Sequence, residues 1–260
     1  MKLLSHIYKE IQGIKSTNEF MPTGLPKVDN FLDGGFTRKE LVVLGGFTGS
    51  GKSFLSAQIF FNIAKQGFKS AYFSLEIAGS MIVSRLIGQI ANIKPTRIMY
   101  GLLNGEENKA RMVAKSKLSP FENLMHFSDD VYKMVDMMKI IEENKYDFVV
   151  VDFIQNVITG EKDEYAAMSL AALEFQKMAK RLNCCVLVVS QLSNYAARTG
   201  LVEYKGSGGI AMVADLGFFI KRHEEEEKKD IMTLAIRKNR RGVSGVSWDL
   251  SFISPGGLIK

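Results

Sequence analysis

The sequence predicts an α/β protein with a mostly parallel, twisted β-sheet and helices on both faces of that sheet. Short, fully apolar runs alternate with stretches of helical periodicity along most of the chain, and buried strands separated by helices are typical of parallel sheets. The last three apolar runs follow one another with no helix between them, so we expect antiparallel strands at the carboxyl-terminal edge of the sheet. The hydrophobic content of 46% is sufficient for one large core.

The predicted strands are the apolar runs themselves. They cover residues 41–44, 71–75, 148–151, 186–189, 216–220, 232–236 and 246–252. The predicted helices cover residues 53–66, 80–91, 95–117, 132–144 and 163–182. In the last helix, Ala171, Phe175, Met178 and Leu182 recur at helical spacing, which indicates one buried stripe.

Composition excludes several classes of protein. The chain of 260 residues has no apolar run near the roughly 20 residues that a membrane-spanning helix needs. Its first residues lack the apolar stretch of a secretory signal, so we expect a cytoplasmic protein with no membrane partner. Cys184 and Cys185 are adjacent on a predicted buried strand, and no His/Cys cluster indicates structural zinc. The net charge of +6 allows a polyanionic partner, although an ordinary basic surface explains it equally well.

The chain divides into a short amphipathic segment, residues 1–20, and one large domain, residues 21–260. In the segment, Leu4, Ile7, Ile11 and Ile14 recur at helical spacing with charged residues between them. An apolar stripe of this kind is stable only when it is buried against another surface. That surface belongs either to the same chain or to a neighbouring subunit.

Residues 46–53 form a complete phosphate-binding loop of the pattern G-x-x-x-x-G-K-[ST], placed between a predicted strand and a predicted helix. Its glycines allow backbone N–H groups to converge on phosphate oxygens, and the following helix adds its positive end. We therefore predict an ATP site in which Lys52 reaches the β- and γ-phosphates and the Ser53 hydroxyl binds Mg²⁺. The predicted nucleotide contacts are Gly46, Thr48, Gly49, Ser50, Gly51, Lys52, Ser53 and Phe54.

Polar residues end three of the predicted strands. Ligands collect at the carboxyl ends of parallel strands, so we expect Glu76, Asp152 and Gln191 to lie on the same side as the phosphate loop. Asp152 suits a Mg²⁺ ligand. Glu76 suits a general base for the water that attacks the γ-phosphate, and Gln191 suits a contact that reports loss of that phosphate.

Taken together, the motifs resemble the RecA-like P-loop ATPase domain of DnaB-type replicative ring helicases, without the usual N-terminal domain. The matching residues are 22–24, 34–35, 46–53, 73–76, 151–155, 190–192, 206–208 and 238–242. The resemblance implies a hexamer that translocates on single-stranded DNA in a prokaryotic or phage-infected cell, with ATP and Mg²⁺ bound between subunits and a helicase loader or primase as a further partner.

The resemblance also assigns roles to individual residues. Lys52, Glu76 and Gln191 would be catalytic, and Ser53 and Asp152 would hold the metal. Lys238 and Arg240 match the family's K-x-R-x-G pattern, which implies that they reach the neighbouring subunit's nucleotide, with Arg240 as the arginine finger.

The loop over residues 193–208 is the candidate DNA contact, through Arg198, Lys205, Gly206 and Ser207. The loop at 159–164 is acidic, although DNA phosphates favour basic contacts.

Two other kinds of function fit the same fold. One is a recombination ATPase of the RecA or RadA kind, which binds DNA as a filament. The other is an assembly or regulatory ATPase that binds no nucleic acid, which the acidic loop after Asp152 would suit.

Overall fold

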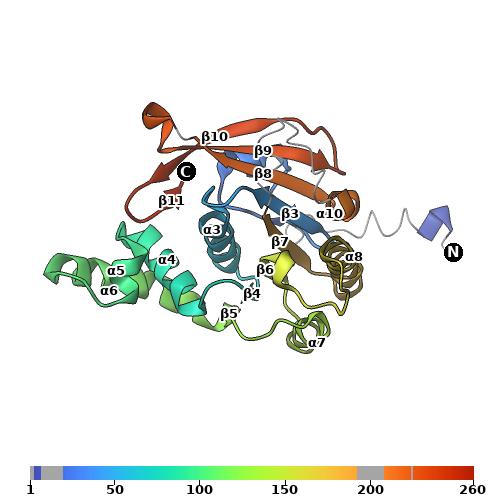
Figure 1. Cartoon of the computed structure of the whole chain (residues 1–260), viewed down its shortest axis with the longest axis horizontal. Helices are drawn as coiled ribbons and strands as arrows, with labels where there is room; N and C mark the ends of the chain where they lie inside the picture. The colour runs from blue at the N-terminus through green and yellow to red at the C-terminus, as the bar shows by residue number, and fades with distance from the viewer. Residues whose placement is uncertain (1–2, 7–19, 192–207, 224) are drawn as a thin grey trace.

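The computed structural model describes residues 3–6, 20–191, 208–223 and 225–260 of the chain. Within these residues one nine-stranded sheet has the strand order β11-β10-β9-β8-β3-β7-β6-β4-β5 (Figure 1). Its strands are β3 (Leu41–Gly46), β4 (Ser70–Ser74), β5 (Met125–Ser128), β6 (Phe148–Asp152), β7 (Cys185–Gln191), β8 (Leu216–Arg222), β9 (Ile231–Asn239), β10 (Ser247–Ile253) and β11 (Leu258–Ile259). A second sheet pairs β1 (Phe20–Met21) with β2 (Phe36–Thr37).

Strand direction confirms the predicted α/β class and the antiparallel strands at the carboxyl-terminal edge. Strands β5, β4, β6, β7, β3 and β8 are parallel, and β9, β10 and β11 are antiparallel to their neighbours. The last three predicted runs form β8, β9 and β10, which are antiparallel to one another as expected, and β8 also pairs in parallel with β3, with Val42 opposite Leu216 and Gly46 opposite Ile220. The carboxyl end of β8 therefore lies on the same side as the carboxyl ends of the other parallel strands, where ligands bind in such sheets.

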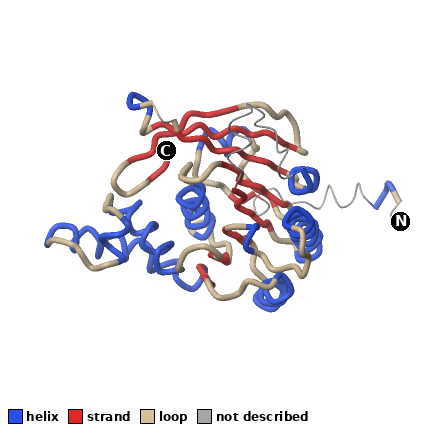
Figure 2. The backbone as a smooth tube through the Cα atoms, viewed as in Figure 1, coloured by secondary structure: helices blue, strands red, loops and turns tan. Residues whose placement is uncertain are grey.

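Helices cover both faces of the sheet, as Figure 2 shows. One face packs against α3 (Lys52–Ala64) and α4 (Gly79–Ala91), and the other packs against α7 (Met134–Asn144), α8 (Glu164–Leu182) and α10 (Gly208–Val213). Side chains of β3 alternate between the two cores, since Val42 and Leu44 belong to the first and Leu41 and Val43 to the second. Before β3 the chain forms the short helix α2 (Pro26–Phe31).

The helix predicted over residues 95–117 is wrong as a single element. The chain forms α5 (Pro95–Met99) and α6 (Gly105–Leu118), followed by the 3₁₀ turn η1 (Ser119–Leu124). Gly101 has a φ of 67°, which is left-handed, and the Asn104 side chain accepts from the Glu107 N–H at 2.9 Å while Glu107 accepts from the Asn104 N–H. This capping box begins a new helix at Gly105.

Two further expectations concern the core and membranes. Cys184 and Cys185 are buried and unbridged, as expected of core residues, and burial raises the pKa of the Cys184 thiol to about 11. In the part of the chain that the structure describes, no helix is both long and apolar enough to span a bilayer.

Candidate functional site

A cleft of about 180 Å³ lies at the carboxyl ends of the parallel strands. It is lined by the phosphate loop, the acid after β4, the glutamine that ends β7 and the arginine that ends β8. Its lining residues are Thr48, Gly49, Gly51, Lys52, Ser53, Phe54, Glu76, Arg85, Phe153, Gln191, Arg222 and Phe252.

The phosphate loop needs glycine at particular positions. Gly49 and Gly51 have φ values of 76° and 94°, in the left-handed region that other residues rarely adopt. A Cβ atom on Gly51 would lie 2.5 Å from the Met232 Cε, and one on Gly46 would lie 2.6 Å from the Ile220 carbonyl oxygen. The loop therefore packs closely against β8 and β9. Helix α3 begins directly after it, at Lys52.

Lys52 is held inside the loop. Its Nζ donates to the carbonyl oxygens of Gly46 at 3.0 Å and Phe47 at 2.8 Å, and the residue is 5% exposed. Burial lowers the pKa of Lys52, while the nearby carboxylates of Asp152 and Glu76 oppose that shift. The ammonium group is thus held by the backbone of the phosphate loop itself.

Asp152 ends β6 as a buried carboxylate with one oxygen left open. The residue is 2% exposed and its Oδ2 accepts from the Tyr72 hydroxyl at 2.6 Å, while the Ser53 side chain is near enough to favour the charged form of the carboxyl. Its Oδ1 has no hydrogen-bond partner, and burial raises the pKa of the carboxyl. A buried oxygen without a partner is costly, and Mg²⁺ commonly takes one or two carboxylates, a hydroxyl and phosphate oxygens. Ser53 and Asp152 therefore fit a Mg²⁺ ion.

Gln191 contacts the phosphate loop directly. Its side-chain Nε2 donates to the Thr48 hydroxyl at 2.6 Å. Gln155 holds the backbone of Gln191 from the other side, because its Nε2 donates to the Gln191 carbonyl at 2.8 Å and to the Ser190 hydroxyl at 3.2 Å. The end of β7 is thereby tied both to the loop and to the turn after β6.

Glu76 is exposed and lines the cleft, and Leu75 separates it from the end of β4. The turn before it is fixed because Asn156 donates to the Leu75 carbonyl at 2.9 Å. Glu76, Asp152 and Gln191 thus lie at one edge with the phosphate loop, in the arrangement that their positions at strand ends predicted.

Two cleft arginines were missing from the sequence prediction. The Arg85 guanidinium lies 4.7 Å from the centroid of the Phe54 ring, and that of Arg222 lies 4.5 Å from the Phe252 ring. Arg222 ends β8, so the same strand-end argument would have found it had β8 been assigned as parallel. Arg85 comes from α4, and nothing in the local sequence indicates which way its side chain points.

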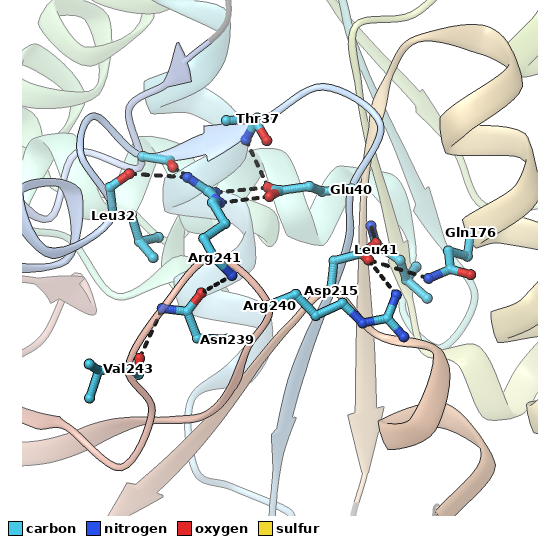
Figure 3. A network of polar contacts seen from close by, with 11 residues as sticks. Leu32, Thr37, Glu40, Leu41, Gln176, Asp215, Asn239, Arg240, Arg241 and Val243 are labelled. Atoms are coloured by element: carbon cyan, nitrogen blue, oxygen red, sulfur yellow. Dashed lines mark hydrogen bonds and ion pairs between the residues drawn. The ribbon is translucent and has the colours of Figure 1, made fainter. Parts of the chain in front are cut away.

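Lys238 and Arg240 lie at the amino ends of the parallel strands, away from the cleft at the carboxyl ends. Because β9 is antiparallel to β8, it ends beside the start of β8, and the start of β8 in turn pairs with the start of β3. Arg240 forms an ion pair with Asp215 at 2.9 Å, and Asp215 accepts from the Leu41 N–H at 2.9 Å (Figure 3). Both Arg240 and Lys238 also donate to the Met212 carbonyl at the end of α10. The phosphate loop begins at the other end of β3, about 16 Å away at the usual rise per residue.

The predicted DNA contacts Arg198, Lys205, Gly206 and Ser207 lie outside the described residues. One member of the acidic loop does have a structural role, since the Asp163 carboxylate accepts from the Ala166 N–H at 2.8 Å and caps α8.

Comparison with known proteins gives the fold and the family. One solved structure, described as an ATPase domain, superposes with a TM-score of 0.86 at 21% identity over 98% of this chain and 96% of that one. A KaiC-like protein from Pyrococcus horikoshii gives a TM-score of 0.65 at 15% identity over 92% and 96%. These likenesses show a RecA-like ATPase fold.

Among curated relatives, the replicative DNA helicase DnaB of Treponema pallidum is 25% identical over 88% of this chain, and that of Geobacillus stearothermophilus is 26% identical over 94%. The chain spans about half the length of these relatives, 54% and 55% respectively. The model of the DnaB-like helicase C-terminal domain matches residues 21–255. The chain therefore belongs to the DnaB-like helicase C-terminal domain family.

Proposed function

We propose that this chain is the ATPase motor of a replicative DNA helicase, which moves along single-stranded DNA by hydrolysing ATP at contacts between subunits. The observation that carries the proposal is that the phosphate loop, Glu76 and Gln191 line one cleft, with the buried Asp152 at the same ends of the parallel strands. The recombination and regulatory ATPases that share the fold are less well supported, because the family model and both curated relatives are helicases.

Each cleft residue has a distinct task in hydrolysis. Lys52 exchanges its carbonyl partners for phosphate oxygens, while Ser53 and Asp152 hold Mg²⁺, which when bound neutralises charge on the phosphates. Glu76 accepts the proton of the attacking water. Gln191, already hydrogen-bonded to Thr48, reports the state of the loop to the chain that follows β7.

The position of Arg240 supports a site shared between subunits. Arg240 and Lys238 lie beside the start of β3, at the edge away from the cleft of their own subunit. A finger at that edge serves a neighbour's nucleotide, and an arginine supplied in this way is worth about 10³ to 10⁵ in turnover in comparable systems. Hydrolysis would then depend on assembly.

The remaining partners are proposals drawn from the relatives. We propose a homohexameric ring in the cytoplasm of a prokaryotic or phage-infected cell, with single-stranded DNA in its channel and residues 21–260 as the motor domain. The solved structure of a DnaB-like replicative helicase, described with its interactions with primase, superposes with a TM-score of 0.86 at 21% identity over 99% of this chain and 67% of that one. A primase or a loader is therefore a reasonable partner to test.

Two substitutions test the site. Lys52→Ala removes the charge that faces the phosphates, so nucleotide binding should weaken. Glu76→Gln keeps the shape and should bind ATP normally but lose about 10² to 10⁴ in turnover, because an amide accepts no proton. The measurements are binding of a fluorescent nucleotide and the rate of phosphate release. Wild-type turnover in Glu76→Gln would contradict the assignment of the base.

DNA assays separate the three kinds of ATPase. Strand displacement from a forked substrate supports a helicase. Hydrolysis stimulated by single-stranded DNA without displacement supports a filament ATPase, and hydrolysis indifferent to DNA supports a regulatory ATPase.

A further inference from the structure

We propose that Arg241 is a positioning residue for the shared site: by clamping Glu40 it fixes the hairpin from which Lys238 and Arg240 reach the neighbouring subunit. The inference rests on the proposed function, because a shared site is what the hairpin would serve. Figure 3 shows the arrangement, with Arg241 and Arg240 leaving the same turn toward different carboxylates.

Arg241 is committed to its own subunit by four hydrogen bonds. Its Nε and Nη2 donate to the Glu40 carboxylate at 2.7 and 2.8 Å, a bidentate pair, and its Nη1 and Nη2 also donate to the carbonyl oxygens of Leu32 at 3.1 Å and Gly35 at 3.0 Å. Bidentate guanidinium–carboxylate pairs fix both distance and orientation. A side chain held in this way is in no position to reach a neighbour's phosphate.

Glu40 is a firm anchor for this pair. The residue is 7% exposed, and its Oε2 also accepts from the Thr37 N–H at 2.9 Å. It immediately precedes β3, and its carbonyl oxygen accepts from the Val186 N–H at 2.9 Å in β7. The hairpin is therefore attached to the start of the strand that leads to the phosphate loop of the same subunit.

The turn itself is closed by a second set of contacts. The Asn239 Oδ1 accepts from the Arg241 N–H at 2.9 Å, and the Asn239 Nδ2 donates to the Val243 carbonyl at 2.9 Å. The Arg240 N–H donates to the Asp215 carbonyl at 3.0 Å. With the backbone fixed on both sides of Arg240, only its side chain is left to move.

Arg240 is more exposed and less firmly bound than Arg241, as expected of an arginine finger. Its side chain is 45% exposed against 26% for Arg241, and its carboxylate contact uses Nη1 alone. The pair with Asp215 places the guanidinium at the edge of the sheet, where a partner's phosphate could replace the carboxylate. If the Arg240 side chain exchanges Asp215 for a phosphate, its backbone must stay fixed, because displacing a catalytic group by about 1 Å can lower the reaction rate roughly 10²-fold.

The test measures turnover and nucleotide affinity in Arg241→Ala, Arg241→Lys and Glu40→Gln, each as the assembled protein. We expect kcat to fall about 100-fold in Arg241→Ala, with the KM for ATP within about twofold of wild type because each subunit's own cleft is intact. Arg241→Lys keeps the charge but loses the fork, so its kcat should lie between. Arg237→Ala on β9 removes the same charge at an exposed position and serves as the matched control.

Mixing experiments distinguish positioning from a general loss of structure. Arg241→Ala subunits keep Glu76, and Glu76→Gln subunits keep an intact hairpin, so mixed contacts should recover part of the activity. No recovery would mean that Arg241→Ala damages its own cleft, and it would overturn the inference, as would wild-type kcat in both Arg241→Ala and Glu40→Gln. If Arg241→Ala does not fold, Glu40→Gln, which keeps the shape of the carboxylate, is mixed in its place under the same criteria.

A parallel mixture of Arg240→Ala with Glu76→Gln tests the shared site itself. If that mixture recovers no activity, the proposed function fails and the positioning role fails with it. If that mixture recovers and the Arg241→Ala mixture does not, only the positioning role fails.

Discussion

Tyr72 positions the carboxylate that we propose as the metal ligand. Its hydroxyl donates to the Asp152 Oδ2 at 2.6 Å and lies 2.8 Å from the Ser56 hydroxyl, in a fully buried setting. Burial, and then the charge of Asp152, raise the pKa of the Tyr72 phenol well above its usual range, so it stays a donor. One carboxylate oxygen is thereby occupied, and the other, Oδ1, is left for a ligand.

We expect Tyr72→Phe to affect both stability and metal dependence. The Asp152 Oδ2 would lose its buried donor, which should lower the free energy of unfolding by about 1–3 kcal/mol. A carboxylate free to turn should also need a higher Mg²⁺ concentration for half-maximal hydrolysis. Thermal unfolding and Mg²⁺ titration of the ATPase rate measure the two effects. Tyr146→Phe, which removes a hydroxyl from another largely buried ring, is the matched control, and identical behaviour of the two variants would contradict the prediction.

The residues of the site differ in how far the sequence could predict them. The phosphate loop, Glu76 just after β4 and Asp152 at the end of β6 were predictable because a motif and a strand end are local features. The pair of Arg241 with Glu40 joins residues 201 positions apart, and no local pattern brings them together. Arg222 was missed for a different reason, since its location depends on the direction of β8 relative to β3.

At the scale of elements, periodicity predicted every major strand of the sheet except the short β5 and β11, and it predicted the long helices α3, α4, α7 and α8 to within a few residues. It failed between residues 95 and 117, where the capping box at Asn104 interrupts a pattern that looks continuous. The edge strand β5 has intermediate burial throughout, so its sequence carries no continuous apolar run. Buried elements can be recognised from their composition, and half-exposed ones cannot.

The loop before α10 belongs to the predicted DNA interface. We expect a double variant, Arg198→Ala with Lys205→Ala, to bind single-stranded DNA more weakly and with a shallower salt dependence. Each lost phosphate contact should reduce the slope of log K against log salt by about 0.7. Titrations of a labelled oligonucleotide at several salt concentrations, with an ATP analogue present, measure the slope. Lys109→Ala, whose side chain on α6 is 76% exposed, is the control, and an unchanged slope in the double variant would exclude the loop.

The amphipathic segment should contribute to assembly. Leu4 is 65% exposed on its own subunit, whereas Ile7, Ile11 and Ile14 lie outside the described residues. An apolar stripe of this kind favours docking on a neighbour. Deleting residues 1–16 should lower the oligomer mass measured by light scattering and leave the subunits folded. As a control, replacing the polar Lys9 and Glu10 with alanine should leave the oligomer mass unchanged. An unchanged oligomer mass after the deletion would mean that the stripe packs on its own chain and not on a neighbour.

For the whole molecule, the shared site that we propose would take its two halves from opposite ends of the parallel strands. The cleft lies at the carboxyl ends of the parallel strands, and Arg240 lies beside the start of β3. A contact between such different surfaces is heterologous, so repeating it gives either a closed ring or an open filament. The rotation that relates neighbouring subunits decides between ring and filament, and the structure of one subunit does not define that rotation.

Mass in solution with a non-hydrolysable ATP analogue therefore separates the two assemblies. We expect a single hexamer-sized species, because nucleotide bound in the cleft supplies the anion that draws the neighbour's Arg240 away from Asp215 and closes the contact. Arg240→Glu should shift the distribution toward smaller species even at saturating analogue, since it sets a carboxylate against the phosphates. Arg237→Glu places the same charge change on an exposed position of β9 and should leave the distribution as it is. A mass that grows continuously with protein concentration would establish a filament, and with it a motor of the recombination type.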